Sequence, residues 1–255
     1  MKIKRIRTAV TAALVTTVSV SLAVSGCAKV DTVSPDDARK EPAPQAAGKP
    51  GGTDCGETKC VALTFDAGPS QNTPKLLDIL KKDKVPATFF LLGKKHIDRY
   101  PELVRRIANE GHEVANHTWS HGILTDLSDE EVREEIGRPQ REIKKLTGTE
   151  PTLMRPPQGR TDDNISEISK SLGVSQVLWS VTAKDYQTTD SKLIKKRVLE
   201  QTERDGIILL HDIYKGTVPA VPGIIKALKK KGYTFVTVPE LLAPAKPVPG
   251  TIYRP

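Results

Sequence analysis

The chain has few aromatic residues, and it shows no internal repeat. Aromatic side chains make up 4% of its 255 residues, and no cluster of lysine and arginine is interleaved with them. Proteins that bind nucleic acid usually combine a basic patch with aromatic residues that stack on bases, so a nucleic-acid partner is not expected. Without a repeat, the long C-terminal part of the chain predicts one domain with a sizeable core.

The first seven residues contain no acidic side chain, although they carry four basic ones. An apolar stretch over 9–24 follows, and then Val24-Ser25-Gly26-Cys27. A basic start, an apolar centre and small residues at a cleavage site predict a secretory signal over 1–26. Small residues directly before a cysteine resemble a bacterial lipobox, so we expect lipid on the thiol of Cys27 and a location on the outer face of the cell membrane.

An uncleaved transmembrane anchor is the alternative interpretation of this segment. The apolar stretch is shorter than the roughly 20 residues that a spanning helix needs, which favours the lipoprotein. The formal net charge is +8, and residues 1–26 contribute four positive charges, so the mature chain carries 8 − 4 = +4. That charge suits an anionic membrane surface or cell wall.

Residues 27–52 are rich in proline, alanine, glycine and charge, without a periodic apolar face. This composition predicts a flexible tether, followed by a globular domain over 53–255. Cys55 and Cys60 lie close together in the chain and, outside the cytoplasm, in an oxidising compartment. They are expected either to form a disulfide that closes a short loop before the first strand or to remain two free thiols.

Strand-like and helix-like segments alternate through the domain, which predicts a parallel sheet with helices outside it. Seven strand-like segments favour a barrel. Ser128, with Glu131 three residues later, is a capping-box pattern for a helix that runs to about Leu146, with Gly148 beyond it. The predicted strands are 61–65, 87–92, 113–115, 152–154, 176–181, 207–210 and 234–238, and the predicted helices are 73–82, 101–109, 128–146, 164–172, 191–201 and 221–230.

Five short motifs come at the carboxyl ends of these predicted strands. In a barrel those ends meet on one face, and that is where active sites are built. The motifs are Thr64-Phe65-Asp66-Ala67-Gly68-Pro69, His117-Thr118-Trp119-Ser120-His121, Arg155-Pro156-Pro157-Gln158-Gly159, Asp185-Tyr186 and Leu209-Leu210-His211-Asp212.

His117 and His121 are four residues apart, a spacing that on a helical turn places both imidazoles on one face. Two such imidazoles can bind one metal ion, and two polar residues on a solvated turn are the alternative. Asp66 is either a general base or a side chain that caps the turn at Gly68-Pro69.

Together the motifs resemble the polysaccharide deacetylase family, which is built on the NodB homology domain and is also called carbohydrate esterase family 4. The resemblance implies an irregular (β/α) barrel of about seven strands, an α/β fold. It implies a divalent metal, zinc first, bound by His117 and His121. It also implies that Asp66 is the catalytic base and that Arg155 pairs with it, which favours the ionised carboxylate.

The same resemblance assigns the remaining site residues. Asp185 orients His211, which protonates the leaving amine. The backbone N–H of Gln158 binds the oxyanion, and Tyr186 and Leu209 form the apolar wall around the acetyl methyl group. Tyr186 stands where tryptophan is usual.

Ala67 departs from the family pattern, because most members have there an aspartate that is the third metal ligand. Thr182 also stands where many relatives have an aspartate. Three functions therefore remain open. They are a metal-dependent deacetylase of N-acetylated glycan (peptidoglycan or chitin-like), a non-catalytic wall-binding lipoprotein, and an O-acetyl esterase. The retained base, arginine, histidines and acid pair favour an enzyme, expected to be a monomer.

Overall fold

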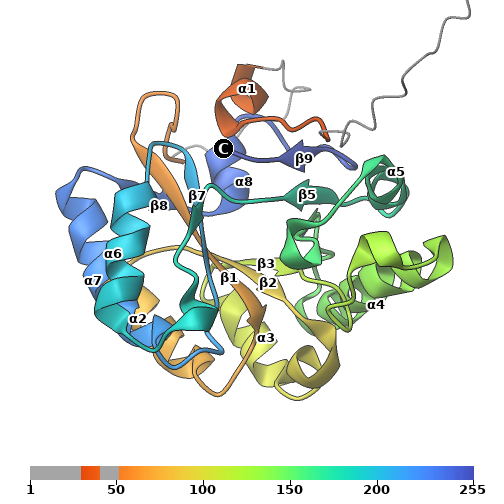
Figure 1. Cartoon of the computed structure of the whole chain (residues 1–255), viewed down its shortest axis with the longest axis horizontal. Helices are drawn as coiled ribbons and strands as arrows, with labels where there is room; N and C mark the ends of the chain where they lie inside the picture. Colours follow the sequence, from red (N-terminus) through yellow and green to blue (C-terminus); the bar gives the residue numbers. More distant parts are fainter. Residues whose placement is uncertain (1–29, 41–51) are drawn as a thin grey trace, which may run out of the picture.

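The computed structural model describes residues 30–40 and 52–255, and Figure 1 shows a parallel sheet with helices around it. Within those residues the sheet has nine strands, in the order β6-β7-β1-β2-β3-β4-β5-β9, with β8 paired to β1. All recorded pairs are parallel. The strands are β1 Cys60–Gly68, β2 Thr88–Leu91, β3 Glu113–Asn116, β4 Leu153–Met154, β5 Ser175–Val177, β6 Val181–Thr182, β7 Gly206–Leu210, β8 Thr234–Val236 and β9 Ile252–Tyr253.

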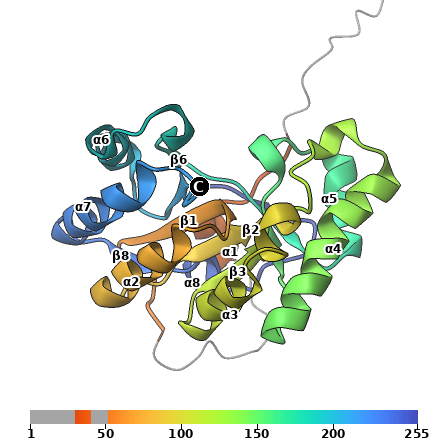
Figure 2. The same cartoon turned by 90° about the horizontal axis from the view of Figure 1, so that it is seen from below.

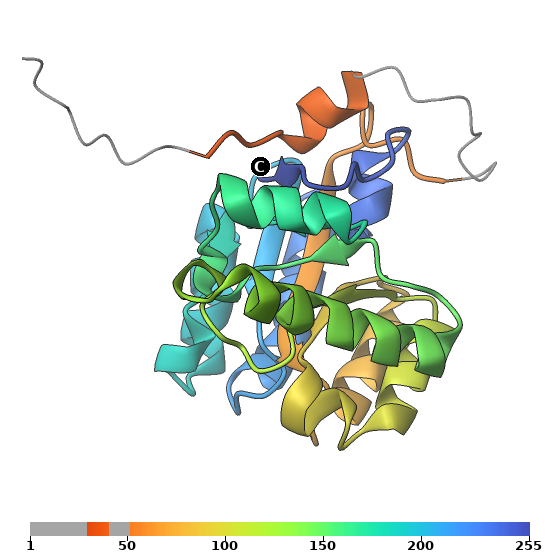
Figure 3. The ribbon, with the colours of Figure 1, turned by 90° about the vertical axis from the view of Figure 1, so that its right-hand side faces the viewer.

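The helices surround the sheet, as the view from below shows (Figure 2), and α4 and α5 lie side by side on one flank (Figure 3). The predicted α/β barrel architecture is confirmed, as a curled half-barrel. The helices are α1 Pro35–Lys40, α2 Thr73–Asp83, α3 Pro101–Asn109, α4 Asp129–Thr147, α5 Asp163–Ser171, α6 Ser191–Gln201, α7 Thr217–Lys230 and α8 Val238–Leu242.

Strand β1 is buried along its whole length, and its two faces have different roles. Val61, Leu63 and Phe65 belong to the core cluster that also contains residues of the outer helices. Because side chains alternate along a strand, Thr64 and Asp66 point to the other side, into the barrel. The alternation therefore directs one acidic side chain into the interior at the carboxyl end of the strand.

Most of the predicted helices and strands are confirmed, but the strand predicted over 176–181 is divided, and strand β9 and helix α8 were not predicted. The capping box of Ser128 and Glu131 starts α4, and Gly148 ends it in the left-handed conformation. The single strand predicted over 176–181 is two strands, because Leu178 N–H bonds to Tyr253 while Ser180 N–H bonds to Ile207, on another part of the sheet. Strand β9, which pairs with β5, was not predicted.

Residues 30–40 correct part of the prediction of a flexible tether. They lie beside the end of the sheet where β1 and β7 begin, at the top of Figure 1. Val33 bridges to Tyr253 of β9, and α1 buries Ala38. Arg39 donates to the carbonyl of Leu241 at 2.8 Å and contacts Asp205 Oδ2 at 2.6 Å. Composition alone missed this order because it comes from contacts with distant parts of the chain.

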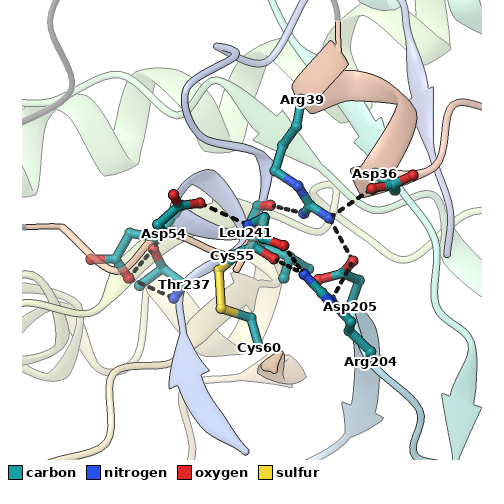
Figure 4. The surroundings of a disulfide bond; sticks show 11 residues. Asp36, Arg39, Asp54, Cys55, Cys60, Arg204, Asp205, Thr237 and Leu241 are labelled. Atoms are coloured by element: carbon teal, nitrogen blue, oxygen red, sulfur yellow. Dashed lines mark hydrogen bonds and ion pairs between the residues drawn. A yellow bond between two sulfur atoms is a disulfide. The ribbon is translucent and has the colours of Figure 1, made fainter. Parts of the chain in front are cut away.

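The predicted pairing of Cys55 with Cys60 is confirmed. Figure 4 shows the disulfide beside Arg39, Arg204 and Asp205. Arg204 donates to the carbonyl oxygens of the disulfide loop, so the loop, the start of β7 and α1 are joined in one network. Within the described ranges no helix is long and apolar enough to cross a membrane. The predicted signal over 1–26 and the lipid site at Cys27 lie outside the described residues.

Candidate functional site

A cavity of ≈ 630 Å³ opens at the carboxyl ends of the strands. Seven of the predicted site residues line it, and they come from five separate segments: Asp66, His117, His121, Gln158, Tyr186, Leu209 and His211. Arg155 and Asp185 are not in its wall, and each is instead bonded to a residue that is. The structure thus brings together the side chains that the motifs predicted.

Arg155 is fully buried and forms an ion pair with Asp66, with Arg155 Nη1 2.6 Å from Asp66 Oδ1. Arg155 Nη1 also donates to Thr64 Oγ1 at 2.8 Å, and Arg155 Nε donates to the carbonyl of Val177 at 2.9 Å. The guanidinium lies 4.0 Å from the centre of the Phe90 ring. These contacts leave the Arg155 side chain little freedom. Its ion pair therefore fixes the orientation of the Asp66 carboxylate from the side away from the cavity.

His117 is buried, and its ring is oriented by a backbone carbonyl. His117 Nδ1 lies 2.8 Å from the carbonyl oxygen of Arg155, and a carbonyl can only accept, so Nδ1 carries the proton. The lone pair is then on Nε2, which lies 3.8 Å from Asp66 Oδ2. Burial, only partly opposed by the charge of Asp66, lowers the pKa of His117 to about 4, so the imidazole is neutral near pH 7.

His121 lies beside His117, although the segment is not the helical turn that the spacing predicted. Thr118 and His121 both have positive φ, 70° and 66°, which breaks a right-handed turn. The two rings nevertheless meet edge to face, with centroids 4.9 Å apart. Burial also lowers the pKa of His121. Two neutral imidazoles therefore share one wall of the cavity.

This pair fits a metal ion held through two protein ligands. The Nδ1–H of His117 is bonded to a carbonyl, which is the usual second contact of a ligating histidine. Ala67 lines the cavity with φ of 62° and offers no donor atom. Among residues 30–40 and 52–255 no three His, Cys, Asp or Glu side chains form a metal-binding group. Catalytic zinc usually has three protein ligands, so the donor set here is one short.

His211 and Asp185 form the second ion pair of the site. Asp185 Oδ1 lies 2.9 Å from His211 Nδ1, and Asp185 Oδ2 accepts from the backbone N–H of His211 at 2.7 Å. Thr217 Oγ1 donates to the same Oδ2 at 2.7 Å. Burial alone would lower the pKa of His211, but the hydrogen bond and charge of Asp185 outweigh it, and the pKa is raised. This imidazole can hold a proton near neutral pH.

The remaining predicted residues that line the cavity are Gln158, Leu209 and Tyr186. Gln158 has a φ of 58°, within a short turn after Pro157. Leu209 is 5% exposed and lies in the wall, whereas Tyr186 is 52% exposed and meets His211 edge-on at 6.3 Å between ring centres. Tyr186 is therefore at the rim more than in the wall.

Other residues of the site were not predicted. His96, Trp179 and Tyr214 also line the cavity, beside Thr182. His96 Nδ1 lies 3.0 Å from the carbonyl of Pro69, which orients the ring. Asp212 was part of a motif but was given no role, because nothing in the sequence shows that its side chain is fully buried. His96 carries no signal in the sequence, since it belongs to none of the five motifs.

Comparison with known proteins agrees with this geometry. The family model described as polysaccharide deacetylase matches residues 53–177. The chain is 43% identical over 184 residues to the peptidoglycan-N-acetylmuramic acid deacetylase PdaC of Bacillus subtilis, covering 72% of the chain and 38% of PdaC. It is 38% identical to a peptidoglycan-N-acetylglucosamine deacetylase of Bacillus cereus, covering 72% of the chain and 88% of that protein. The chain spans about two fifths of the length of PdaC.

Solved structures give the same result. A structure named T48 deacetylase with substrate superposes with a TM-score of 0.75 and 37% identity, covering 79% of this chain and 99% of that one. A structure of BA3943 from Bacillus anthracis, which is described as a CE4 family pseudoenzyme, superposes with a TM-score of 0.70 and 27% identity, covering 77% and 70%. A mutant of BA3943 is described as having restored enzymatic activity.

Proposed function

The chain belongs to the polysaccharide deacetylase family, and from that premise we propose that it hydrolyses N-acetyl groups of an extracellular glycan, peptidoglycan or a chitin-like polymer. The observation that carries the proposal is the presence, in one cavity, of a carboxylate paired with arginine and an imidazole paired with a carboxylate. The names of the relatives support peptidoglycan as the substrate. Hydrolysis of an amide needs both a base for water and an acid for the leaving amine, and this cavity offers one of each.

In this mechanism Asp66 accepts a proton from the attacking water, and Arg155 holds that carboxylate in position. The backbone N–H of Gln158, at the cavity wall, donates to the oxyanion that develops on the acetyl group. His211, protonated because of Asp185, donates to the nitrogen as the carbon–nitrogen bond breaks. Leu209 and Tyr186 contact the acetyl methyl group and exclude water from it.

His117 and His121 are the residues that would hold a divalent metal ion, for which zinc suits imidazole ligands. When bound, such an ion acidifies water and polarises carbonyl oxygens. The neutral state of both imidazoles at pH 7 means that no proton has to leave before they bind a cation. Because Ala67 supplies no carboxylate as a third ligand, we expect weaker binding than a full ligand set would give.

A non-catalytic wall-binding protein is the second candidate, and Ala67 is the observation that favours it. The similarity to a pseudoenzyme of the same family supports that possibility. A pure binder, however, has no physical need for both Asp66 with its arginine and His211 with its carboxylate. An O-acetyl esterase is the third candidate, since the same tetrahedral chemistry serves esters and amides.

One experiment separates these three candidates. The purified domain, with its zinc content measured, is incubated with N-acetylglucosamine oligomers, with peptidoglycan and with O-acetylated xylan, and released acetate is measured. The proposal expects acetate from an N-acetylated glycan and none from the Asp66→Asn variant. Acetate from the xylan alone would establish the esterase. Glycan binding with no acetate, at full zinc occupancy, would establish the binder.

We also propose that the protein is a lipid-anchored monomer at the outer face of the cell membrane. The segment Val24-Ser25-Gly26-Cys27 and the basic start of the chain support this location. A Cys27→Ser variant is expected to leave unprocessed or released protein when cells are fractionated. Unchanged membrane attachment of the variant would point to a transmembrane anchor.

A further inference from the structure

Asp212 directly follows His211, yet its side chain does not line the cavity. It is fully buried, and its Oδ2 accepts a short hydrogen bond from Thr73 Oγ1 at the start of α2. Thr73 is also fully buried. A carboxylate placed in the interior one residue from a proposed catalytic acid requires a physical reason, because burial of a charged group is costly.

The hydrogen bonds around Thr73 have a defined direction. The backbone N–H of Ser70 donates to Thr73 Oγ1 at 2.7 Å, so the one hydroxyl proton of Thr73 is free to go to Asp212. The backbone carbonyl of Asp212 accepts from Ser70 Oγ at 3.3 Å and from Asn72 Nδ2 at 2.8 Å. Three side chains of the segment 70–73 therefore converge on Asp212.

The other carboxylate oxygen shows that this arrangement has a cost. Asp212 Oδ1 has no hydrogen-bond partner among the described residues. It lies against Gly68, where an added Cβ would come within 2.9 Å of it. Burial raises the pKa of Asp212 to about 6 although Thr73 opposes the shift. An apolar residue here would avoid the desolvation, so the role of the carboxylate lies in the bond that its other oxygen accepts from Thr73.

The hydrogen bonds between Asp212 and the segment 70–73 connect the part of the site that carries Asp66 with the part that carries His211, beyond the end of the sheet. The last residues paired between β1 and β7 are Phe65 and Leu210, and Asp66 and His211 each come one residue later in the chain. Past that point the segment 68–73 is bonded to Asp212, while Leu92 N–H bonds to the carbonyl of Gly68 on the other side.

We propose that Asp212 is a positioning residue that, through Thr73, holds the segment after Asp66 against the strand end that carries His211, and so fixes the separation of base and acid. This rests on the proposed deacetylase function. Displacing a reacting group by about 1 Å can lower the rate about 10²-fold, so a modest shift of this segment is enough to matter.

The test compares Thr73→Val, which keeps the shape and removes the hydroxyl, with Thr73→Ser, which keeps the hydroxyl. Thr202→Val is the matched control, because Thr202 Oγ1 donates to the carbonyl of Val198 in α6 and Thr202 does not line the cavity. Thr73→Val is expected to lower kcat about tenfold or more, with KM changed less than about threefold. Thr73→Ser is expected to retain most of the wild-type kcat. Equal kcat in Thr73→Val and Thr202→Val, both folded by thermal melting, would overturn the proposal.

A second readout does not depend on turnover. The proton between His211 Nδ1 and Asp185 Oδ1 is expected to give a low-field NMR signal, which Thr73→Val should shift or broaden and Thr202→Val should leave unchanged. If the wild type releases no acetate but this signal responds to Thr73→Val, the proposed activity is wrong and the positioning role stands. An unchanged signal together with an unchanged kcat contradicts the role of Asp212 itself.

Discussion

Arg155 Nη1 and Asp66 Oδ1 are 2.6 Å apart, and the two side chains are 0% and 3% exposed. A buried pair of this kind rarely adds to stability by itself, because desolvation of both charges offsets their attraction. Removing one partner is far worse, since it leaves an unpaired charge in the interior. Arg155 is thus expected to be intolerant of substitution for reasons of folding as well as catalysis.

Ala67→Asp is expected to tighten zinc binding by about tenfold or more, equivalent to roughly 1.4 kcal/mol. The φ of 62° at this position is one that aspartate tolerates better than most residues, and the new carboxylate would supply the missing third ligand. The measurement is calorimetric titration of the metal-free protein with zinc. Ala67→Asn is the matched control, with similar shape but no charge. A weaker affinity in Ala67→Asp would mean that the cavity is built around the small residue.

Asp185→Asn is expected to move the basic limb of the pH–rate profile toward lower pH and to reduce the rate about 10²-fold or more. The pKa of His211 is raised because Asp185 outweighs burial, so without that charge burial prevails and the proton is lost at lower pH. The measurement is kcat for acetate release at pH values from about 5 to about 10, a range that covers the titration of an imidazole. A basic limb at unchanged pH would assign it to another group.

Glu113→Gln is expected to raise the melting temperature at pH 8 by about 3 °C or more and to change it little at pH 4. Burial, and then Glu240, raises the pKa of Glu113 from 4.5 to about 7. The folded protein therefore binds this proton more tightly than the unfolded chain does. Its stabilising contribution is complete below pH 4.5 and is lost as the pH rises through 7. Glu57→Gln, at an exposed position, is the control, and an equal gain for Glu113→Gln at both pH values would contradict the account.

Arg39→Ala is expected to release residues 30–40 from the domain. The amide of Val33, which bonds to the carbonyl of Ile252, should then exchange with solvent about tenfold faster or more. Lys40→Ala is the control, because the Lys40 side chain is 66% exposed and its ion pairs among the described residues are with Asp36 and Asp37, within α1 itself. Equal exchange in the two variants would show that the ion pair with Asp205 does not hold the segment.

The sequence predicted those features that depend on local chemistry. The capping box at Ser128 needs only residues three apart, and the strand at 61–65 needs only its own apolar run. It did not predict the ordering of residues 30–40, because Arg39 binds a residue 166 positions away. It predicted that His121 lies beside His117 but not the turn that brings them together, which depends on positive φ at Thr118 and His121. Burial of Asp212 is likewise a property of the assembled barrel.

For the candidate site, too, the sequence predicted local features but not the contacts between distant residues. Motifs at strand ends identified seven of the side chains that line the cavity, because parallel strands bring their carboxyl ends to one face. The contacts that orient them, such as the carbonyl of Arg155 on His117 and that of Pro69 on His96, depend on backbone positions that no motif specifies.

The place of α1 in the fold has a consequence for how the molecule would work at a surface. Its segment is bonded to the end of the barrel where the strands begin, and the cavity opens at the end where they finish. If Cys27 carries the lipid, residues 28–32 separate the anchor from Val33, which is bonded to the domain. An anchored chain would then present its cavity on the side away from the bilayer. The distance from the membrane at which the cavity meets the cell wall would then be set by the height of the domain. That distance would increase only if the ion pair between Arg39 and Asp205 broke.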